Sequence, residues 1–436
     1  MNAIGVLLSR VRCATHLLVC RGVPPLLLIA GTADACLAQA PVGTIAYIRD
    51  RSEIRTIAAD GTGDRLLWKH PNPSVAGGIF GTTGLAWSPD GQELAFASGH
   101  ETGCSFFESD IYTIRADGSG LRRITNPPSY TAAQALPHGA VVVTVQNDAV
   151  RGPTSGLLLV SIAGADKVQT MVVPRGETRT TTFDHVADLG DASQPIIALQ
   201  GMYRWAIPGI NVFAGQTIKA PPLVLMGNGL RNFGAHRPVW RPDGKEIGYT
   251  LGSGVGLYAI STSAKPGAGP GHELAGTSKP GAATFDWGPA NAPGGPILYT
   301  GALVSKDNAV YQASVDGTQR RKVLSTDAEF DYMLDVHWLP DGSGFLYIQN
   351  SNTAGSSDVF RHDFATGRST QLTRVQGKHI QALDVSPDGK WVAYLQTTEL
   401  WPSLSEPEKP AIWIMRVDGS AQRLLVENGN APTWKR

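Results

Sequence analysis

The side chains in this sequence that are best suited to binding chemistry are histidines, arginines and aromatic residues lying between β-rich runs. Imidazole, guanidinium, carboxylate and aromatic groups around one concave site suit recognition of a polar ligand or a partner segment. No catalytic set can be identified among them. The candidate binding residues are His236, Arg237, Asp331, Tyr332, His379, Tyr203, Arg204, Trp205 and His100.

Some of these histidines could in principle converge on a metal ion. The set would be His236 and His379 with His100 or His185. No close His-x-His or His-x-x-x-His spacing supports such a site, so we predict no metal and no cofactor. Aspartates recur before glycines, but no acidic cluster accompanies them. We therefore expect them to form turns and not to bind Ca²⁺.

The elements that must position the candidates are repeated β-hairpins. A Pro-Asp-Gly phrase between two β-rich runs occurs at 89–91, 242–244, 340–342 and 387–389. Proline fixes φ at the first corner of the turn, aspartate bonds its own backbone, and glycine accepts the positive φ that closes the hairpin. A tryptophan two residues before the proline recurs in three copies and predicts core packing between repeats.

A second alternating run, which ends in Asp-Gly, follows each hairpin. Examples are 111–118 and 412–419, and a further short β-rich run comes after each. One unit is therefore four strands joined by tight turns, which predicts an all-β β-propeller of four-stranded antiparallel blades. The turns recur about every 47 to 53 residues. This spacing predicts eight blades, with 131–173 and 182–226 as two irregular units; the alternative is seven blades, if that region holds only one.

The two ends of the repeat region complement each other. Residues 45–48 and 54–68 supply the last three strands of a unit, and 430–436 resemble the beginning of one. We predict that the C-terminal strand pairs into the first blade and closes the ring, which removes exposed edges.

The first forty residues have a different composition. Three arginines precede the apolar run 23–30, and small residues continue to Ala40, as in a secretory signal. The apolar core is too short to span a bilayer. We expect a leader at 1–40 and a single propeller domain at 41–436. There are two alternatives for this segment. It could carry a lipid anchor on Cys36, although the residues before that cysteine match a lipoprotein signal poorly, or it could be a disordered N-terminal extension.

Charge and cysteine content exclude some classes of function. Without residues 1–40, which hold three arginines and one aspartate, the chain has 34 basic and 36 acidic groups. Because a nearly neutral protein does not attract a polyanion, this balance does not favour binding to nucleic acid. Only Cys104 remains outside the leader, so no intrachain disulfide is expected.

The phrases Trp-Ser-Pro-Asp-Gly at 87–91 and Ile-Tyr-x-Ile-x-x-Asp-Gly at 111–118 resemble the WD40-like repeats of TolB-like β-propellers. The resemblance covers about 44–436 and implies a periplasmic or secreted bacterial domain. Similar blades occur in prolyl oligopeptidases, dipeptidyl peptidases and oligogalacturonate lyases. The chain shows neither the small domain that precedes the TolB blades nor the Gly-x-Ser-x-Gly motif of the peptidases. No functional residue is therefore carried over.

Up-and-down strands put the tight turns on one face of the ring and the longer, varied loops on the other. We call the second face the long-loop face; it holds 98–109, 146–154, 226–235, 325–331 and 396–410. Variable loops on a rigid scaffold usually carry binding. We expect an exported, non-enzymatic, monomeric propeller that binds a protein or peptide of the cell envelope over this face. The alternative is a propeller enzyme, a polysaccharide lyase or hydrolase that could depend on a metal, with its site at the channel mouth.

Overall fold

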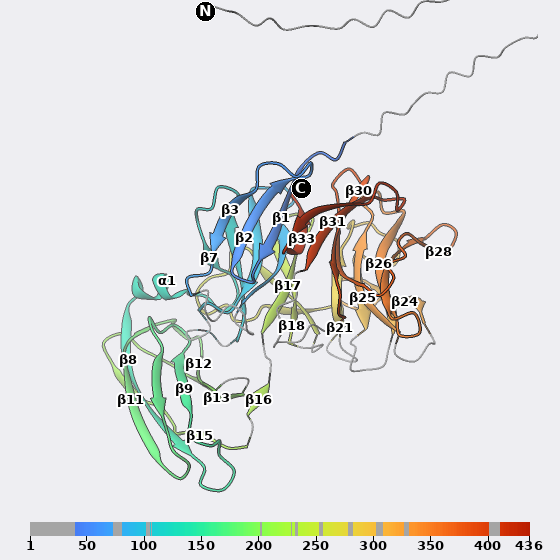
Figure 1. The fold of residues 1–436 in the computed structure, drawn as a ribbon. Helices are drawn as coiled ribbons and strands as arrows, with labels where there is room; N and C mark the ends of the chain where they lie inside the picture. The colour runs from blue at the N-terminus through green and yellow to red at the C-terminus, as the bar shows by residue number, and fades with distance from the viewer. Residues whose placement is uncertain are drawn as a thin grey trace, which may run out of the picture. The chain divides into compact units, whose positions relative to one another are not determined.

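Short antiparallel sheets, most of them four-stranded, make up the chain in the computed structural model (Figure 1). The structure describes residues 40–72, 81–101, 105, 107–200, 203–227, 229–231, 234–252, 256–277, 282–301, 308–326, 331–400 and 410–436. The predicted leader with Cys36, Cys104 and much of the loop 396–410 lie outside these residues.

Three four-stranded sheets of blade topology involve the two ends of the repeat region and its first half. Blade 1 has the order β3-β2-β1-β33 and consists of β1 (Thr44–Arg49), β2 (Glu53–Ala58), β3 (Arg65–Lys69) and β33 (Asn430–Trp434). Blade 2 consists of β4 (Thr82–Trp87), β5 (Glu93–Ser98), β6 (Asp110–Arg115) and β7 (Arg122–Arg123). Blade 3 consists of β17 (Ala235–Trp240), β18 (Glu246–Leu251), β19 (Gly256–Ser261) and β20 (His272–Leu274).

Three more sets of four strands complete the described propeller. Blade 4 consists of β21 (Ala282–Trp287), β22 (Ile297–Gly301), β23 (Ala309–Ala313) and β24 (Arg320–Ser325). Blade 5 consists of β25 (Tyr332–Trp338), β26 (Gly344–Ser351), β27 (Ser356–Asp363) and β28 (Arg368–Gln371). Blade 6 consists of β29 (His379–Val385), β30 (Trp391–Thr397), β31 (Ala411–Arg416) and β32 (Arg423–Glu427). One parallel residue pair, Ser357 with His379, links blades 5 and 6.

The repeated aspartates form the tight turns, as predicted. Asp90 accepts hydrogen bonds from Gln92 N at 3.0 Å and from Ser88 Oγ at 2.6 Å, and Gly91 has a φ of +66°. The same bond, which the backbone N–H two residues later donates to the Asp carboxylate, recurs in the other Pro-Asp-Gly turns and in the Asp-Gly turns between the third and fourth strands. These bonds lie within each turn, so they fix the hairpin without the help of long-range contacts.

The inner strands of the six blades contact one another in sequence around a central axis. β33 contacts β4, β4 contacts β17, and the series continues through β21, β25 and β29 back to β33. β33 also pairs antiparallel with β1, with Ile45 opposite Trp434 (Figure 1). Trp434 is fully buried there. The C-terminal residues therefore supply the inner strand of blade 1.

The recurring tryptophans at the ends of inner strands are core residues. Trp87, Trp240, Trp287 and Trp338 are each no more than 7% exposed. Trp240 Nε1 donates to Ala86 O of the preceding blade at 3.0 Å, so this ring joins two blades. The prediction of packing between repeats is confirmed.

Residues 130–231 have a different topology, and we call this segment the insert. It begins with α1 (Tyr130–Gln134). One sheet has the order β11-β8-β14, with β15 also on β8; it consists of β8 (His138–Asn147), β11 (Thr178–Ala187), β14 (Thr217–Lys219) and β15 (Leu223–Leu225). The other has the order β10-β9-β12-β13-β16 and consists of β9 (Leu157–Ile162), β10 (Gln169–Val172), β12 (Gln194–Gln200), β13 (Tyr203–Ile210) and β16 (Leu230–Arg231).

The prediction that 131–173 and 182–226 are two blades is therefore wrong. β8 pairs with β11 and β9 with β12, so each sheet takes strands from both supposed units, and two strands run parallel to β8. The two sheets share one apolar core built from their alternating side chains. The described residues hold six sets of four strands with blade topology, two of them joined in one eight-stranded sheet, so neither eight blades nor seven is confirmed.

Candidate functional site

A central cavity of about 1070 Å³ runs between the inner strands β4, β17, β21, β25, β29 and β33. Each of these strands has one extra residue relative to its neighbour in the same blade, a β-bulge. Bulges re-aim side chains and are common beside functional sites. In every inner strand, the residues one and three positions before the end are among those that line the cavity. We call this cavity the channel.

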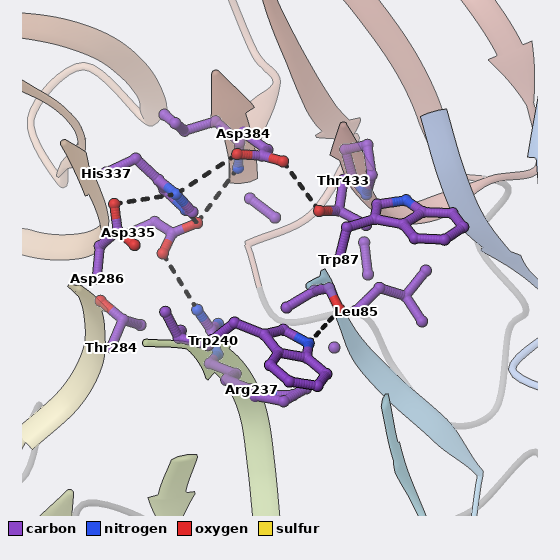
Figure 2. A pocket seen from close by; sticks show the side chains of 18 of the residues that line it. Leu85, Trp87, Arg237, Trp240, Thr284, Asp286, Asp335, His337, Asp384 and Thr433 are labelled. Carbon is purple, nitrogen blue, oxygen red and sulfur yellow. Dashed lines mark hydrogen bonds and ion pairs between the residues drawn. The ribbon is translucent and has the colours of Figure 1, made fainter. Parts of the chain in front are cut away.

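One wall of the channel is charged (Figure 2). His337 on β25 lies between carboxylates of three strands: its Nε2 is 3.4 Å from Asp335 Oδ2, and its Nδ1 is 3.9 Å from both Asp286 Oδ2 and Asp384 Oδ1. Asp286 comes from β21 and Asp384 from β29. An imidazole surrounded in this way is held in its protonated form.

The pKa values of this cluster follow from burial and charge together. Burial alone lowers the pKa of His337, but Asp335, Asp286 and Asp384 outweigh it and raise the pKa to about 9. Burial raises the pKa of Asp335, whereas the His337 charge, its hydrogen bond and Arg237 act more strongly, so the net pKa of this carboxyl is below its usual value. His337 and Asp335 therefore form an ion pair at neutral pH.

The three carboxylates also join consecutive blades. Asp286 Oδ2 accepts from Trp338 N at 2.7 Å, Asp335 Oδ2 accepts from Leu383 N at 3.2 Å, and Asp384 Oδ2 accepts from Trp434 N at 2.7 Å. Each bond links an inner strand to the next one around the ring. The charged wall is thus rigid, because its anions are fixed by backbone donors.

Two arginines extend the charged wall toward opposite ends of the channel. Arg237 on β17 has a side chain 46% exposed and places its Nη1 3.5 Å from Asp335 Oδ1. That distance is long for a charge-assisted hydrogen bond, so guanidinium donors remain available to a ligand. Arg436 instead donates to Asp384 Oδ1 and to Val385 O, both at 2.9 Å.

The opposite wall is small and apolar. β4 and β17 contribute Gly84, Leu85, Ala86, Pro238 and Val239 to the lining. A cavity with one charged and one apolar wall can hold a ligand that is itself two-sided, such as a peptide segment with a polar and an apolar edge.

The structure places only two of the predicted binding residues on the channel. His236 and Arg237 both line it, at the end that faces the long-loop face. Burial, with the nearby Arg237 charge, lowers the pKa of His236 to about 4, so this imidazole is neutral. At the mouth of the channel, His236 therefore offers a neutral hydrogen-bond donor or acceptor, and Arg237 offers a cation.

The remaining predicted residues of the propeller have local contacts. Asp331 accepts from Asn352 N at 2.9 Å, and His379 Nδ1 lies 3.5 Å from Ser357 Oγ. Tyr332 begins β25 and is partly buried. None of these three is among the residues that line the channel. They shape the loops beside its mouth.

His100 and the aromatic candidates lie elsewhere. His100 packs against Trp68 and Tyr112, with ring centroids 5.2 and 4.3 Å away, and burial lowers its pKa to about 3. Tyr203, Arg204 and Trp205 belong to β13 of the insert. Burial lowers the pKa of Arg204 to about 10, against the opposing effect of Glu108 and Asp110. These four residues do not line the channel.

Asp286, Asp335, His337, Asp384 and Arg436 were missed as candidates. A signal for three of them was present, since Asp286, His337 and Asp384 each stand one residue before the position held by tryptophan in most repeats. A charged residue at that otherwise small or apolar place marks a channel-facing position. Their convergence, however, depends on the order of blades around the ring.

Two further kinds of site are absent from the described residues. They contain no group of three or more His, Cys, Asp or Glu side chains arranged to hold a metal ion. No helix in this part of the chain has the length and hydropathy needed to span a bilayer.

Comparison with known proteins gives a distant relative and several similar folds. No family model matches the chain. Dipeptidyl-peptidase 5 of Porphyromonas gingivalis is 22% identical over 364 residues, which are 71% of this chain and 50% of that protein. The chain thus spans about half the length of this curated relative.

Solved structures similar to the chain include β-propellers called TolB. TolB of Acinetobacter baumannii is 13% identical, with a TM-score of 0.46 over 91% of this chain and 67% of that one. A putative TolB of Agrobacterium tumefaciens is 13% identical, with a TM-score of 0.35 over 88% and 87%. An oligogalacturonate lyase of Vibrio parahaemolyticus is 9% identical, with a TM-score of 0.34 over 88% and 86%. By its own topology, with inner strands that contact one another around a central axis, the chain is a β-propeller.

Proposed function

We propose that this protein is an exported, non-enzymatic propeller that binds a partner protein or peptide at the mouth of its channel. The observation that carries this proposal is the pairing of a rigid charged wall with an apolar wall around a cavity of about 1070 Å³. An extended segment could place its polar groups on one wall and its apolar side chains on the other. The partner would approach over the long-loop face, where His236 and Arg237 lie.

Arg237 is the residue expected to contribute most at the mouth. Its guanidinium offers several donors, and Asp335 remains paired with His337 at 3.4 Å if Arg237 turns to a ligand. Release of Arg237 therefore leaves no uncompensated buried carboxylate. This arrangement suits a ligand that carries a carboxylate or exposed carbonyls.

Two other observations support a peptide ligand and export. The distant relative is named as a dipeptidyl-peptidase, an enzyme that acts on peptides, and the shared part covers most of this chain. Residues 1–40 have the charge and apolar pattern of a secretory signal. Fractionation of producing cells, with mass spectrometry of the mature N-terminus, tests export separately from binding.

The binding test is capture from a cell-envelope extract with the intact protein as bait. Arg237→Ala should reduce the affinity for the captured partner about tenfold, which corresponds to about 1.4 kcal/mol. Lys245→Ala is the matched control, because it removes a cation from a tight turn after β17 on the opposite face. Unchanged capture after joint substitution of His236, Arg237 and Tyr332 would contradict the proposed site.

A further inference from the structure

Two histidines lie side by side on the surface of the insert, in neighbouring antiparallel strands. His138 begins β8 and His185 lies near the end of β11; the ring centroids are 4.4 Å apart and the rings are inclined by 48°. Both side chains are exposed. They are remote in sequence, so the sheet alone brings them together.

A β-bulge orients His185 toward its partner. Phe183 pairs with Val141 and Val186 pairs with Gly139, so Asp184 and His185 together oppose the single residue Ala140. Strict alternation would put residue 185 on the same face as Phe183, which is buried. The extra residue turns the imidazole out to solvent instead, on the face that His138 shares. Bulges that re-aim one side chain are frequent at binding sites.

A carboxylate borders the pair on its far side. Ala165 bridges to Val186, and Asp166 N donates to His185 O at 3.3 Å, so Asp166 is the cross-strand neighbour of His185 away from His138. Asp166 Oδ1 is buried without a hydrogen-bond partner among the described residues. A carboxylate on the neighbouring strand adds negative charge near the pair, which favours a cation there.

We propose that His138 and His185 bind one divalent transition-metal ion. Neutral imidazole is a preferred ligand of Cu²⁺, Ni²⁺ and Zn²⁺, and Cu²⁺ binds such sites most tightly. Two imidazoles bound about 2.0–2.1 Å from one ion in adjacent positions have centroids roughly 4.5–5 Å apart, close to the observed separation. Because the described residues supply no third protein ligand, water fills the other positions. The site is distinct from the channel and independent of the proposed function.

The test is titration of tag-free, metal-stripped full-length protein with CuCl₂, followed by calorimetry and by electron paramagnetic resonance. The wild type should bind one equivalent at this site, with a spectrum that shows two nitrogen ligands. His138→Ala and His185→Ala should each weaken this binding at least tenfold. His272→Ala, which removes an exposed histidine from blade 3, is the matched control and should leave the binding unchanged.

Two outcomes would overturn the proposal. One is equal Cu²⁺ affinity in the wild type and both single variants, with circular dichroism confirming that the variants are folded. The other is an effect of Asp166→Asn larger than that of either histidine substitution, because this would make the carboxylate the main ligand. As a second readout, Cu²⁺ should raise the melting temperature of the wild type and not that of the double variant, since the ion bridges β8 and β11.

Discussion

Asp384 and Trp434 join the last complete blade to the C-terminal strand. Asp384 Oδ2 accepts the backbone N–H of Trp434 at 2.7 Å and also the Thr433 hydroxyl at 2.9 Å. The same carboxylate accepts from Arg436 through Oδ1. One buried side chain thus holds two residues of β33 and the arginine that follows the strand.

Removal of residues 430–436 should strongly destabilise the protein. The deletion leaves β1 with an unpaired edge and removes the fully buried Trp434, whose loss alone is worth about 3–5 kcal/mol. We expect a markedly lower melting temperature and self-association on a sizing column, because exposed edges pair with other chains. A truncated protein that melts and elutes like the intact one would contradict this role of β33.

Asp384→Asn should clearly lower the free energy of unfolding, although the asparagine side chain still offers an acceptor for Trp434 N. It removes the charge that compensates Arg436, whose side chain is 35% exposed, and that faces His337; loss of such a charge-assisted bond costs about 1.5–3 kcal/mol. Asp388→Asn is the control, because this exposed turn residue can be replaced by another good turn former. Denaturant unfolding should separate the two variants clearly; similar midpoints would show that the Asp384 charge contributes little.

The raised pKa of His337 makes stability depend on pH in a definite direction. The pKa is about 9 in the folded protein and about 6.5 in the unfolded chain, so the stabilisation is fully present below pH 6.5 and lost as the pH rises through 9. It amounts to at most about 3 kcal/mol. The difference in unfolding free energy between wild type and His337→Gln should shrink from pH 6 to pH 10. A constant difference would exclude a protonated imidazole.

The sequence was most informative where structure is local. The Pro-Asp-Gly turns were predictable because Asp and Gly fix the backbone within four residues, as the Asp90 and Asp388 bonds confirm. The insert was misread because period-2 alternation describes any half-buried strand. It does not say whether β8 pairs with β11 in a sandwich or with the next strand in a blade. The repeat spacing alone therefore predicted two blades in 131–226, and the sheet topology of this segment contains neither.

The candidate site was only partly predictable, for a related reason. His236 and Arg237 were found because they lie just before a repeat phrase. His337, Asp286 and Asp384 are far apart in sequence, and their meeting depends on the order of β21, β25 and β29 around the axis. The His138–His185 contact depends on a bulge, which pattern reading does not reveal. Long-range order and local backbone irregularity were therefore the missing information.

The direct contact of blade 2 with blade 3, despite the insert between them in sequence, can be tested with one glycine. Gly84 on β4 has a φ of +61°, and a Cβ built on it would lie 2.9 Å from Arg237 Cα on β17. Gly244 has a φ of +72° but no atom within 4 Å of such a Cβ. Gly244→Ala should therefore cost only the backbone strain of about 1–2 kcal/mol.

Gly84→Ala should lower the free energy of unfolding by about 2–4 kcal/mol. This total combines the same backbone strain with a steric clash between the new Cβ and the backbone of β17. The excess over Gly244→Ala reports the close approach of β4 to β17. Equal costs for the two substitutions would show that no backbone approaches Gly84 this closely, and would contradict the direct contact of β4 with β17.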